Sequence, residues 1–477
     1  MQPSFIYAGL AMGILIKSSE VEGRAAGRSR ALYYRDAAQA SLEASWNSQW
    51  IDPTLAEAAL ILALFESSSH PEHTSQRAST AIGFLDSIIR ALSLTFIDAS
   101  DPTVSTFSRR SVPIVPRSSH SPHSSSSRYS SISPHSSPKE SCSCRHFSHL
   151  TPSSPVTSGS PFPTDSQQMS YSWSATLGWD PSWSDAEVRK EEGRRVCWSA
   201  LSLVSGYTAY CVMFQEKPLD LFLIDASNWK LLFPGEILAR PSTSRSPNPS
   251  QRGSPSPKET IWALHCRSML LWNSCLLLRD DTISHEERAD LAWESWVEAG
   301  CIQDALDEHT CNVDTGLMYM CREFIYKYVS LTRLSVTQTL RRLVPSSEIS
   351  SSMFNRKHAE EWLYYQDQLA KHVKSSIHHL GHPQGQFLTR RPWSGEWFAG
   401  QLATCLLLWS RDRSLLLALE LAKSFLVPLD VLNCLWPCAE SQARGQQLRE
   451  RLDAACQSAG MQSPLPRDYT LPPILAR

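Results

Sequence analysis

The sequence is short of positive charge. Only 11 of its 477 residues are lysine, and 45 lysines and arginines stand against 47 acidic residues, which gives a formal net charge of −2. A domain that binds nucleic-acid phosphates by releasing counterions needs a clear basic surplus. We therefore do not expect this chain to bind DNA by itself.

The cysteines lack the spacing of a disulfide framework. There are 13 of them, an odd number, and several stand in apolar helical patterns. Examples are Cys211, Cys266, Cys275 and Cys405. Nothing in the sequence suggests secretion, so we predict reduced, buried thiols in a reducing compartment.

The sequence also lacks an apolar run long enough for a bilayer. Phe5–Ile16 is apolar but falls short of the ~20 residues that a spanning helix needs. It has no basic leader and no small-residue cleavage site, so we predict a core helix rather than a signal peptide. The second apolar stretch, Leu402–Leu429, is interrupted by Arg411, Asp412 and Arg413. No membrane-spanning segment is predicted.

What the sequence does have is helical periodicity. Hydrophobic residues make up 42% of the chain, enough for a sizeable core. Asp52-Pro53 predicts a helix start, and Ile82, Leu85 and Ile89 follow the spacing of one helical face. Capping boxes are predicted at Ser184 with Glu187 and at Ser284 with Glu287, and long helices over Leu317–Leu334 and His358–Leu380. No stretch alternates with the period of a strand, so we predict an all-α, bundle-like fold.

Two stretches rich in serine and proline interrupt this pattern. Residues 101–175 contain 26 serines and 10 prolines, and a second such stretch covers residues 240–258. Segments of this composition bury too little apolar surface to offset the entropy of ordering, so we predict long disordered insertions. The expected organisation is N-terminal helices over 1–100, an insertion over 101–175, further helices over 176–460 and a tail over 461–477.

The same stretches contain Ser-Pro steps that are candidates for proline-directed phosphorylation. A phosphate would add roughly −1.5 to −2 charge at each site. Composition alone also generates such steps, which leaves the two interpretations open. The candidate serines are Ser133, Ser137, Ser154, Ser246 and Ser256.

A group of cysteines and histidines in the first insertion resembles a metal site. Cys142, Cys144, His146 and His149 offer two thiols and two imidazoles. Structural zinc sites space their cysteines more widely and place their histidines on a separate element. We keep these four residues as weak candidates and expect no metal in this chain.

Clustered carboxylates at Asp280, Asp281, Glu286 and Glu287 resemble the aspartate-rich motif of all-helical terpene synthases. Those enzymes hold magnesium against a diphosphate with carboxylates one helical turn apart. Here a new helix is expected to start at Ser284, so helix capping explains the glutamates better. No nucleophile elbow, phosphate loop, dinucleotide fingerprint or zinc-protease motif occurs, and we predict no enzyme.

The most specific stretch reads Glu191-Glu192-Gly193-Arg194-Arg195-Val196-Cys197-Trp198. It resembles the signature of the fungal-specific transcription factor domain, also called the middle homology region. We expect Arg194 and Arg195 to form charge-assisted hydrogen bonds with carboxylates or helix ends. Trp198 is expected to be the large apolar anchor.

Other segments resemble this family in the expected order. Leu232–Glu236, with Pro234 and Glu236, is similar to the short segment that follows the signature helix. Upstream, Asp52–Leu94 is similar to the paired helices, and it includes the Leu62–Glu66 run. A departure follows the signature, where Val204 and Ser205 replace a frequent aspartate.

The resemblance implies the regulatory domain of a fungal zinc-cluster-type transcription factor for RNA polymerase II genes. It implies a nuclear protein whose partners are the transcription machinery or another transcription factor, with a homodimer as an alternative. In that family zinc and DNA are bound by a six-cysteine module that precedes this domain. No cysteine precedes Cys142, so we expect this chain to hold neither zinc nor another cofactor.

Two alternatives from other classes stay open. One is a helical enzyme similar to a terpene synthase, and the other is a helical scaffold unrelated to transcription. A helical fold by itself does not choose between them, because helical bundles serve many functions.

Overall fold

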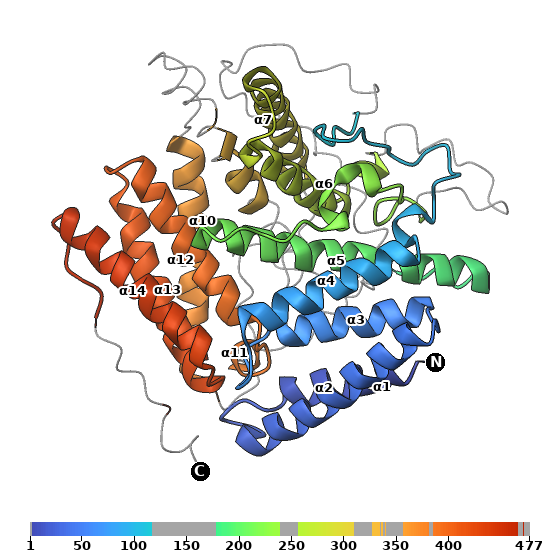
Figure 1. Cartoon of the computed structure of the whole chain (residues 1–477). Helices are drawn as coiled ribbons and strands as arrows, with labels where there is room; N and C mark the ends of the chain where they lie inside the picture. The colour runs from blue at the N-terminus through green and yellow to red at the C-terminus, as the bar shows by residue number, and fades with distance from the viewer. Residues whose placement is uncertain are drawn as a thin grey trace, which may run out of the picture. The chain divides into compact units, whose positions relative to one another are not determined.

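A computed structural model describes residues 2–116, 178–238, 256–309, 327–333, 335–336, 339, 356–380, 385–465 and 471. These residues form twelve α-helices and short 3-10 turns, and none of them is in a strand (Figure 1). The predicted all-α fold class is confirmed.

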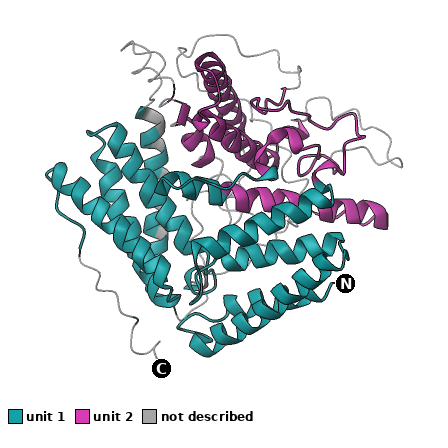
Figure 2. Cartoon of the chain, viewed as in Figure 1, with its two compact units in different colours: residues 1–94, 206–222, 354–477 teal, residues 95–205, 223–353 magenta. Residues whose placement is uncertain are grey.

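The chain forms two compact units that alternate along the sequence (Figure 2). The first unit consists of Met1–Leu94, Gly206–Phe222 and Phe354–Arg477. The second unit consists of Thr95–Ser205 and Leu223–Met353. The first unit therefore takes helices from both sides of the first Ser/Pro-rich stretch.

The first unit begins with two helices that pack along each other, α1 (Pro3–Ile16) and α2 (Arg24–Asn47). Proline fits in the first turn of α1 because a backbone N–H at that position would have no acceptor within the helix, so nothing is lost by its absence. Ala8, Ala11 and Leu15 are completely buried, whereas Ile6 and Leu10 are about half exposed. The predicted core helix thus buries one face only.

Helices α3 (Pro53–Glu66) and α4 (Ser75–Ala91) pack together in the same unit. The Asp52 carboxylate accepts a hydrogen bond of 3.1 Å from the Leu55 N–H, which confirms the predicted cap. Ile82, Leu85 and Ile89 are buried as their spacing predicts. The helix ends at Ala91, and Leu92 is its C-cap.

The rest of the first unit is built from the C-terminal helices, of which α13 contacts α10, α12 and α14. The predicted break in the apolar stretch is confirmed, because α12 ends at Arg411 and α13 starts at Leu416. The bounds are α10 (Arg356–Ile377), α11 (Gln386–Thr389), α12 (Ser394–Arg411), α13 (Leu416–Leu435) and α14 (Ala439–Ser458).

The second unit contains the 3-10 turn η1 (Leu94–Phe96) in part, the first two thirds of α5 (Asp185–Phe214), α6 (Ile261–Ser274) and α7 (His285–Asp307). Helices α6 and α7 share an apolar core, and the buried Arg267–Glu298 ion pair of 2.7 Å also joins them. That core consists of Val112, Ile261, Trp262, Leu264, Leu271, Ala299, Ile302, Ala305, Leu306 and Val329.

The ordered chain extends further into the first Ser/Pro-rich stretch than its composition indicates. Residues 101–116 are described, and Val112 and Val115 are buried, at 5% and 4% exposure. Residues 117–177 lie outside the described residues, as do 239–255 in the second stretch. Most of the predicted Leu317–Leu334 helix also lies outside them, although residues 327–333 are helical.

Among the described residues, helix α5 has the length and apolar composition of a membrane-crossing helix. Its apolar window is 56% buried inside the protein. The core helix of a folded protein passes the same test. The absence of a membrane-spanning segment stays a prediction.

The predicted capping box at the start of α7 is present and can be tested. The Ser284 hydroxyl accepts a hydrogen bond of 3.2 Å from the Glu287 N–H, and the Glu287 carboxylate accepts one of 3.1 Å from the Ser284 N–H. Ser284→Ala should lower the free energy of unfolding by about 1 kcal/mol, because the Glu287 N–H loses its acceptor. Glu294→Ala, an exposed change inside α7, should stay within about 0.5 kcal/mol. The free energies of unfolding are measured in urea, and an equal loss in the Ser284→Ala and Glu294→Ala variants would contradict the capping role.

Candidate functional site

The residues quoted for the family resemblance come together in the second unit. We call this group the signature cluster. It joins three segments of the chain: the turn after η1, the start of α5 and residues 229–236. Its members are Asp98, Glu187, Glu191, Arg194, Arg195, Trp198, Trp229, Leu232, Phe233, Pro234 and Glu236.

Arg194 is the centre of the signature cluster. Its Nε and Nη2 donate to the two oxygens of Asp98, at 2.9 and 2.7 Å, in a bidentate pair. Both side chains are at most 5% exposed. Nη1 donates to Glu187 at 3.0 Å and to Glu191 at 3.3 Å. The predicted charge-assisted hydrogen bonds of Arg194 are confirmed.

The electrostatics of Arg194 follow from these partners. Burial by itself lowers the pKa of the guanidinium, but the hydrogen bonds and negative charge of Asp98 and the two glutamates outweigh it. The pKa of Arg194 is raised above its ordinary value. Asp98 accepts a third hydrogen bond, of 3.0 Å, from the Leu232 N–H. A permanent ion pair thus fixes the backbone at residue 232.

Arg195 lies at the edge of the signature cluster. Its Nε donates to Glu191 at 2.9 Å, and its Nη2 donates to the Gly178 carbonyl at 3.0 Å. The guanidinium carbon lies 3.9 Å from the ring centroid of Trp179, a cation–π geometry. The prediction that this arginine pairs with a carboxylate is also confirmed. Arg195 thereby joins Gly178 and Trp179 to the start of α5.

Trp198 is the apolar anchor that the sequence predicts. It is 7% exposed and stacks on Trp229 and Phe233, with ring centroids 4.8 and 5.3 Å away. Its indole N–H donates to the Leu232 carbonyl at 3.1 Å. Leu232 therefore gives its N–H to Asp98 and its carbonyl to Trp198, so both polar groups are satisfied.

The segment that ends the signature cluster is a type II turn over residues 233–236. Pro234 and Gly235 are its central residues, Gly235 has φ of +94°, and the Glu236 N–H donates to the Phe233 carbonyl at 3.0 Å. The Glu236 carboxylate accepts in return from the Phe233 N–H. Glycine is required at this φ because a side chain would be strained.

The departure after the signature, Val204-Ser205, also has a structural use. Ser205 is fully buried and its hydroxyl accepts a hydrogen bond of 3.1 Å from the Asn273 side chain. The Ser205 side chain thus makes a polar contact to α6. Val204 is fully buried as well.

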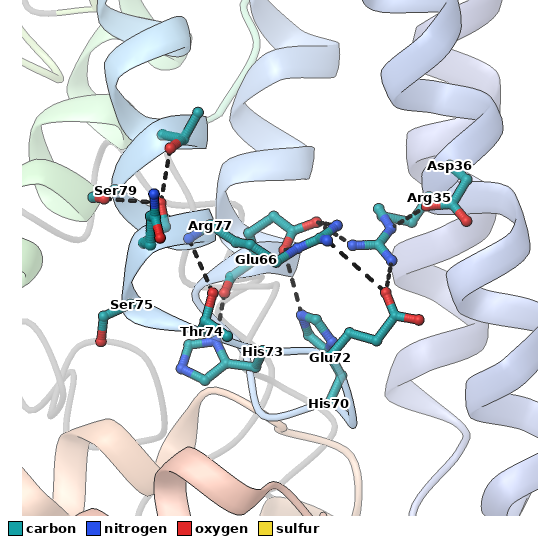
Figure 3. A network of polar contacts seen from close by, with 12 residues as sticks. Arg35, Asp36, Glu66, His70, Glu72, His73, Thr74, Ser75, Arg77 and Ser79 are labelled. Carbon is teal, nitrogen blue, oxygen red and sulfur yellow. Dashed lines mark hydrogen bonds and ion pairs between the residues drawn. The ribbon is translucent and has the colours of Figure 1, made fainter.

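The first unit has its own buried charge network, centred on Glu66 of the Leu62–Glu66 run (Figure 3). Arg35 donates to its carboxylate at 2.8 Å and Arg77 at 3.1 Å. The His70 ring is fully buried, with Nε2 3.6 Å from the same carboxylate. The Glu66 carbonyl contacts His73 Nδ1 at 2.6 Å. This network ties α2, α3 and α4 together.

A second carboxylate secures the start of α4 in that unit. Both oxygens of Glu440 on α14 accept from the Ser75 N–H, at 3.1 and 3.0 Å. Arg444 donates to Glu440 at 2.9 Å and lies over the Tyr210 ring, 4.3 Å from its centroid. The end of α5 is thereby joined to α14 and α4.

Neither network has the arrangement of a catalytic centre. The cations are paired with carboxylates, and Cys197 beside the signature cluster has its pKa raised by burial and by Asp98, which disfavours the thiolate. Within the described parts of the chain, no three potential ligands gather as a metal site would require. The weak candidates Cys142, Cys144, His146 and His149 lie outside those parts.

The clustered carboxylates near residue 280 serve local structure. Asp280 accepts hydrogen bonds from the backbone and hydroxyl of Thr282, at 2.9 and 2.8 Å, and lies 3.5 Å from Arg110. Glu287 closes the capping box. The predicted capping role of Glu287 is therefore confirmed, and the Asp280 carboxylate is hydrogen-bonded within its own turn.

Of the phosphorylation candidates, Ser256 alone falls within the described residues.

Sequence reasoning missed Asp98 and Trp229, two principal partners in the signature cluster. Asp98 lies 96 residues before Arg194, beyond the reach of any local pattern. The Pro234-Gly235 step, by contrast, is a readable turn signal.

Comparison with protein-family models, with curated proteins and with solved structures finds no match for the chain.

Removing one member of the central pair should be costly. We expect Arg194→Ala to lower the free energy of unfolding by about 3–5 kcal/mol, because it leaves buried carboxylates unpaired. Asp98→Ala and the double variant complete a cycle whose coupling should exceed about 1 kcal/mol. Arg195→Ala, at a half-buried side chain, should cost about 1 kcal/mol. The free energies of unfolding are measured by urea titration with tryptophan fluorescence as the signal. If the losses of the two single variants add up to the loss of the double variant, the pair is not coupled.

The type II turn provides a second test with a control of opposite sign. Gly235→Ala should destabilise the second unit by about 1–2 kcal/mol, because alanine is strained at φ of +94°. Gly300→Ala lies inside α7 in open space and should instead stabilise it by up to about 1 kcal/mol. Thermal unfolding of both variants checks the signs. A Gly235→Ala variant as stable as the parent would refute the turn assignment.

Proposed function

We propose that this chain is a transcription-regulating domain of the kind found in fungal zinc-cluster-type transcription factors. It acts in the nucleus through contacts with the transcription machinery or with another transcription factor. DNA contact and zinc belong to a separate module of such factors. Its role is to control whether a DNA-bound factor activates RNA polymerase II genes.

The observation that carries the proposal is the signature cluster. The residues that resemble the family signature, Arg194, Arg195 and Trp198, contact each other's partners in one buried group. That group also contains Pro234 and Glu236, the residues quoted from the later segment. Independent stretches of a chance resemblance have no reason to converge in space. The support is structural, since these contacts are all made within the chain.

A candidate partner surface lies elsewhere in the second unit, on α7. Trp293 and Val297, one helical turn apart, are 59% and 47% exposed. Exposed acidic side chains share this face of the helix: Glu286, Asp290, Glu294, Asp304 and Glu308. An exposed tryptophan within an acidic surround fits a positively charged partner with an apolar groove, by charge complementarity.

A reporter experiment tests the proposed function. The chain is fused to an unrelated DNA-binding domain in yeast, and the activity of a promoter with its site is measured. We expect a change in reporter output that Trp293→Ala with Val297→Ala reduces at least about tenfold, because aromatic anchors dominate such interfaces. The nuclear protein level is measured in parallel.

The matched control is Leu416→Ala with Leu417→Ala, an equally exposed apolar pair on α13 at 44% and 47% exposure. That variant should keep the parent output. A nuclear, folded fusion that leaves the reporter unchanged would refute a regulatory role in transcription and favour a scaffold. Equal loss in both variants would refute the assignment of the partner surface to α7.

A further inference from the structure

A short segment before α6 fastens several parts of the second unit. We call Ser256–Thr260 the clasp. The Lys258 ammonium donates to the Thr103 carbonyl at 2.7 Å and to the Ser105 hydroxyl at 2.8 Å. It also lies 3.8 Å from a carboxylate oxygen of Glu236. One cation therefore connects the 101–116 segment with the turn that ends the signature cluster.

The backbone of the clasp is held on its other sides. Arg267 of α6 donates to the Lys258 carbonyl at 3.2 Å, and the Glu259 carbonyl contacts His309 Nε2 at 2.6 Å. The Thr260 hydroxyl donates to the Pro234 carbonyl at 3.3 Å and caps α6 by accepting from the Ala263 N–H. The segment is therefore fixed, and Lys258 is its contact with residues 103–105.

Ser256 begins the clasp and precedes Pro257. Its backbone is extended, with φ of −55° and ψ of 135°, as proline requires of the residue before it. The side chain is half-buried, and its hydroxyl accepts from the Lys258 N–H at 3.3 Å. An extended, partly exposed Ser-Pro step is the form of peptide that a proline-directed kinase binds. Ser256 is thus in the same turn as Lys258.

We propose that Ser256 is a phosphorylation site and that its phosphate releases residues 103–105 from the clasp. In the reaction, Ser256 Oγ attacks the γ-phosphorus of ATP, and the new O–P bond replaces the bond to the β–γ bridging oxygen. ADP leaves, and the hydroxyl proton passes to the base of a proline-directed protein kinase. The inference is independent of the proposed function.

The direction of the effect follows from charge. The phosphate brings about −1.5 to −2 charge and three acceptor oxygens into the turn that contains Lys258. Thr103 and Ser105 offer Lys258 neutral oxygens, whereas hydrogen bonds between ionised partners are roughly twice as strong. The phosphate therefore takes the ammonium from these two residues. It also repels Glu236, which shares Lys258.

The experiment uses the full chain, a proline-directed kinase of the mitogen-activated class and ATP. Mass spectrometry locates the phosphate, and hydrogen exchange is followed in peptides from residues 101–116. We expect modification of Ser256 and roughly tenfold faster exchange there, the effect of losing a charge-assisted hydrogen bond. A Ser256→Ala chain is the matched control, because it keeps the other Ser-Pro steps and should show no acceleration.

A second variant tests the role of Lys258. Lys258→Met keeps the length of the side chain and removes its charge, so exchange in residues 101–116 should already be fast without the kinase. Phosphorylation should then add nothing further. An unmodified Ser256 in the parent chain overturns the proposal, and so does modification with unchanged exchange. Further acceleration in the phosphorylated Lys258→Met chain overturns the release mechanism.

Discussion

The bidentate pair between Arg194 and Asp98 is the interaction on which the second unit depends. A guanidinium removed from water needs several acceptors, and a buried carboxylate needs donors, so neither side chain is tolerated there alone. Asp98 meets this need with Arg194 and the Leu232 N–H. The pair therefore determines where the segment with Trp229 and Phe233 runs, and so where the ring of Trp198 packs.

The first unit solves a similar problem with the charges reversed. There one buried carboxylate, Glu66, is surrounded by Arg35, Arg77 and His70. Such networks add little to stability compared with a well-packed apolar core, because desolvation opposes the Coulomb attraction. Such networks require a more specific geometry than an apolar core does, because all of their hydrogen bonds form together in only one arrangement of the helices. We regard both networks as devices that select a single packing.

The sequence predicts features whose determinants are close together in the chain. The caps at Asp52 and Ser284 depend on residues three positions apart. The all-α class follows from periodicity in the same way. Asp98 could not be predicted, because a contact across 96 residues has no local pattern and many acidic residues could have filled the role. Composition likewise failed to show that residues 101–116 are ordered, because two buried valines count little among many serines.

The charged side chains of the signature cluster are paired with one another. Because its cations and carboxylates satisfy one another, the cluster holds together the segments that contribute to it. We therefore assign the regulatory contacts that we propose to surfaces outside the cluster. Two surfaces in the second unit meet that condition: the acidic face of α7 around Trp293, and the clasp at Lys258. The first offers unpaired apolar area to a partner, and the second offers a cation that a new negative charge can redirect. The two surfaces are held differently: α7 packs on the apolar core that it shares with α6, whereas Lys258 of the clasp lies 3.8 Å from Glu236 and so touches the signature cluster itself.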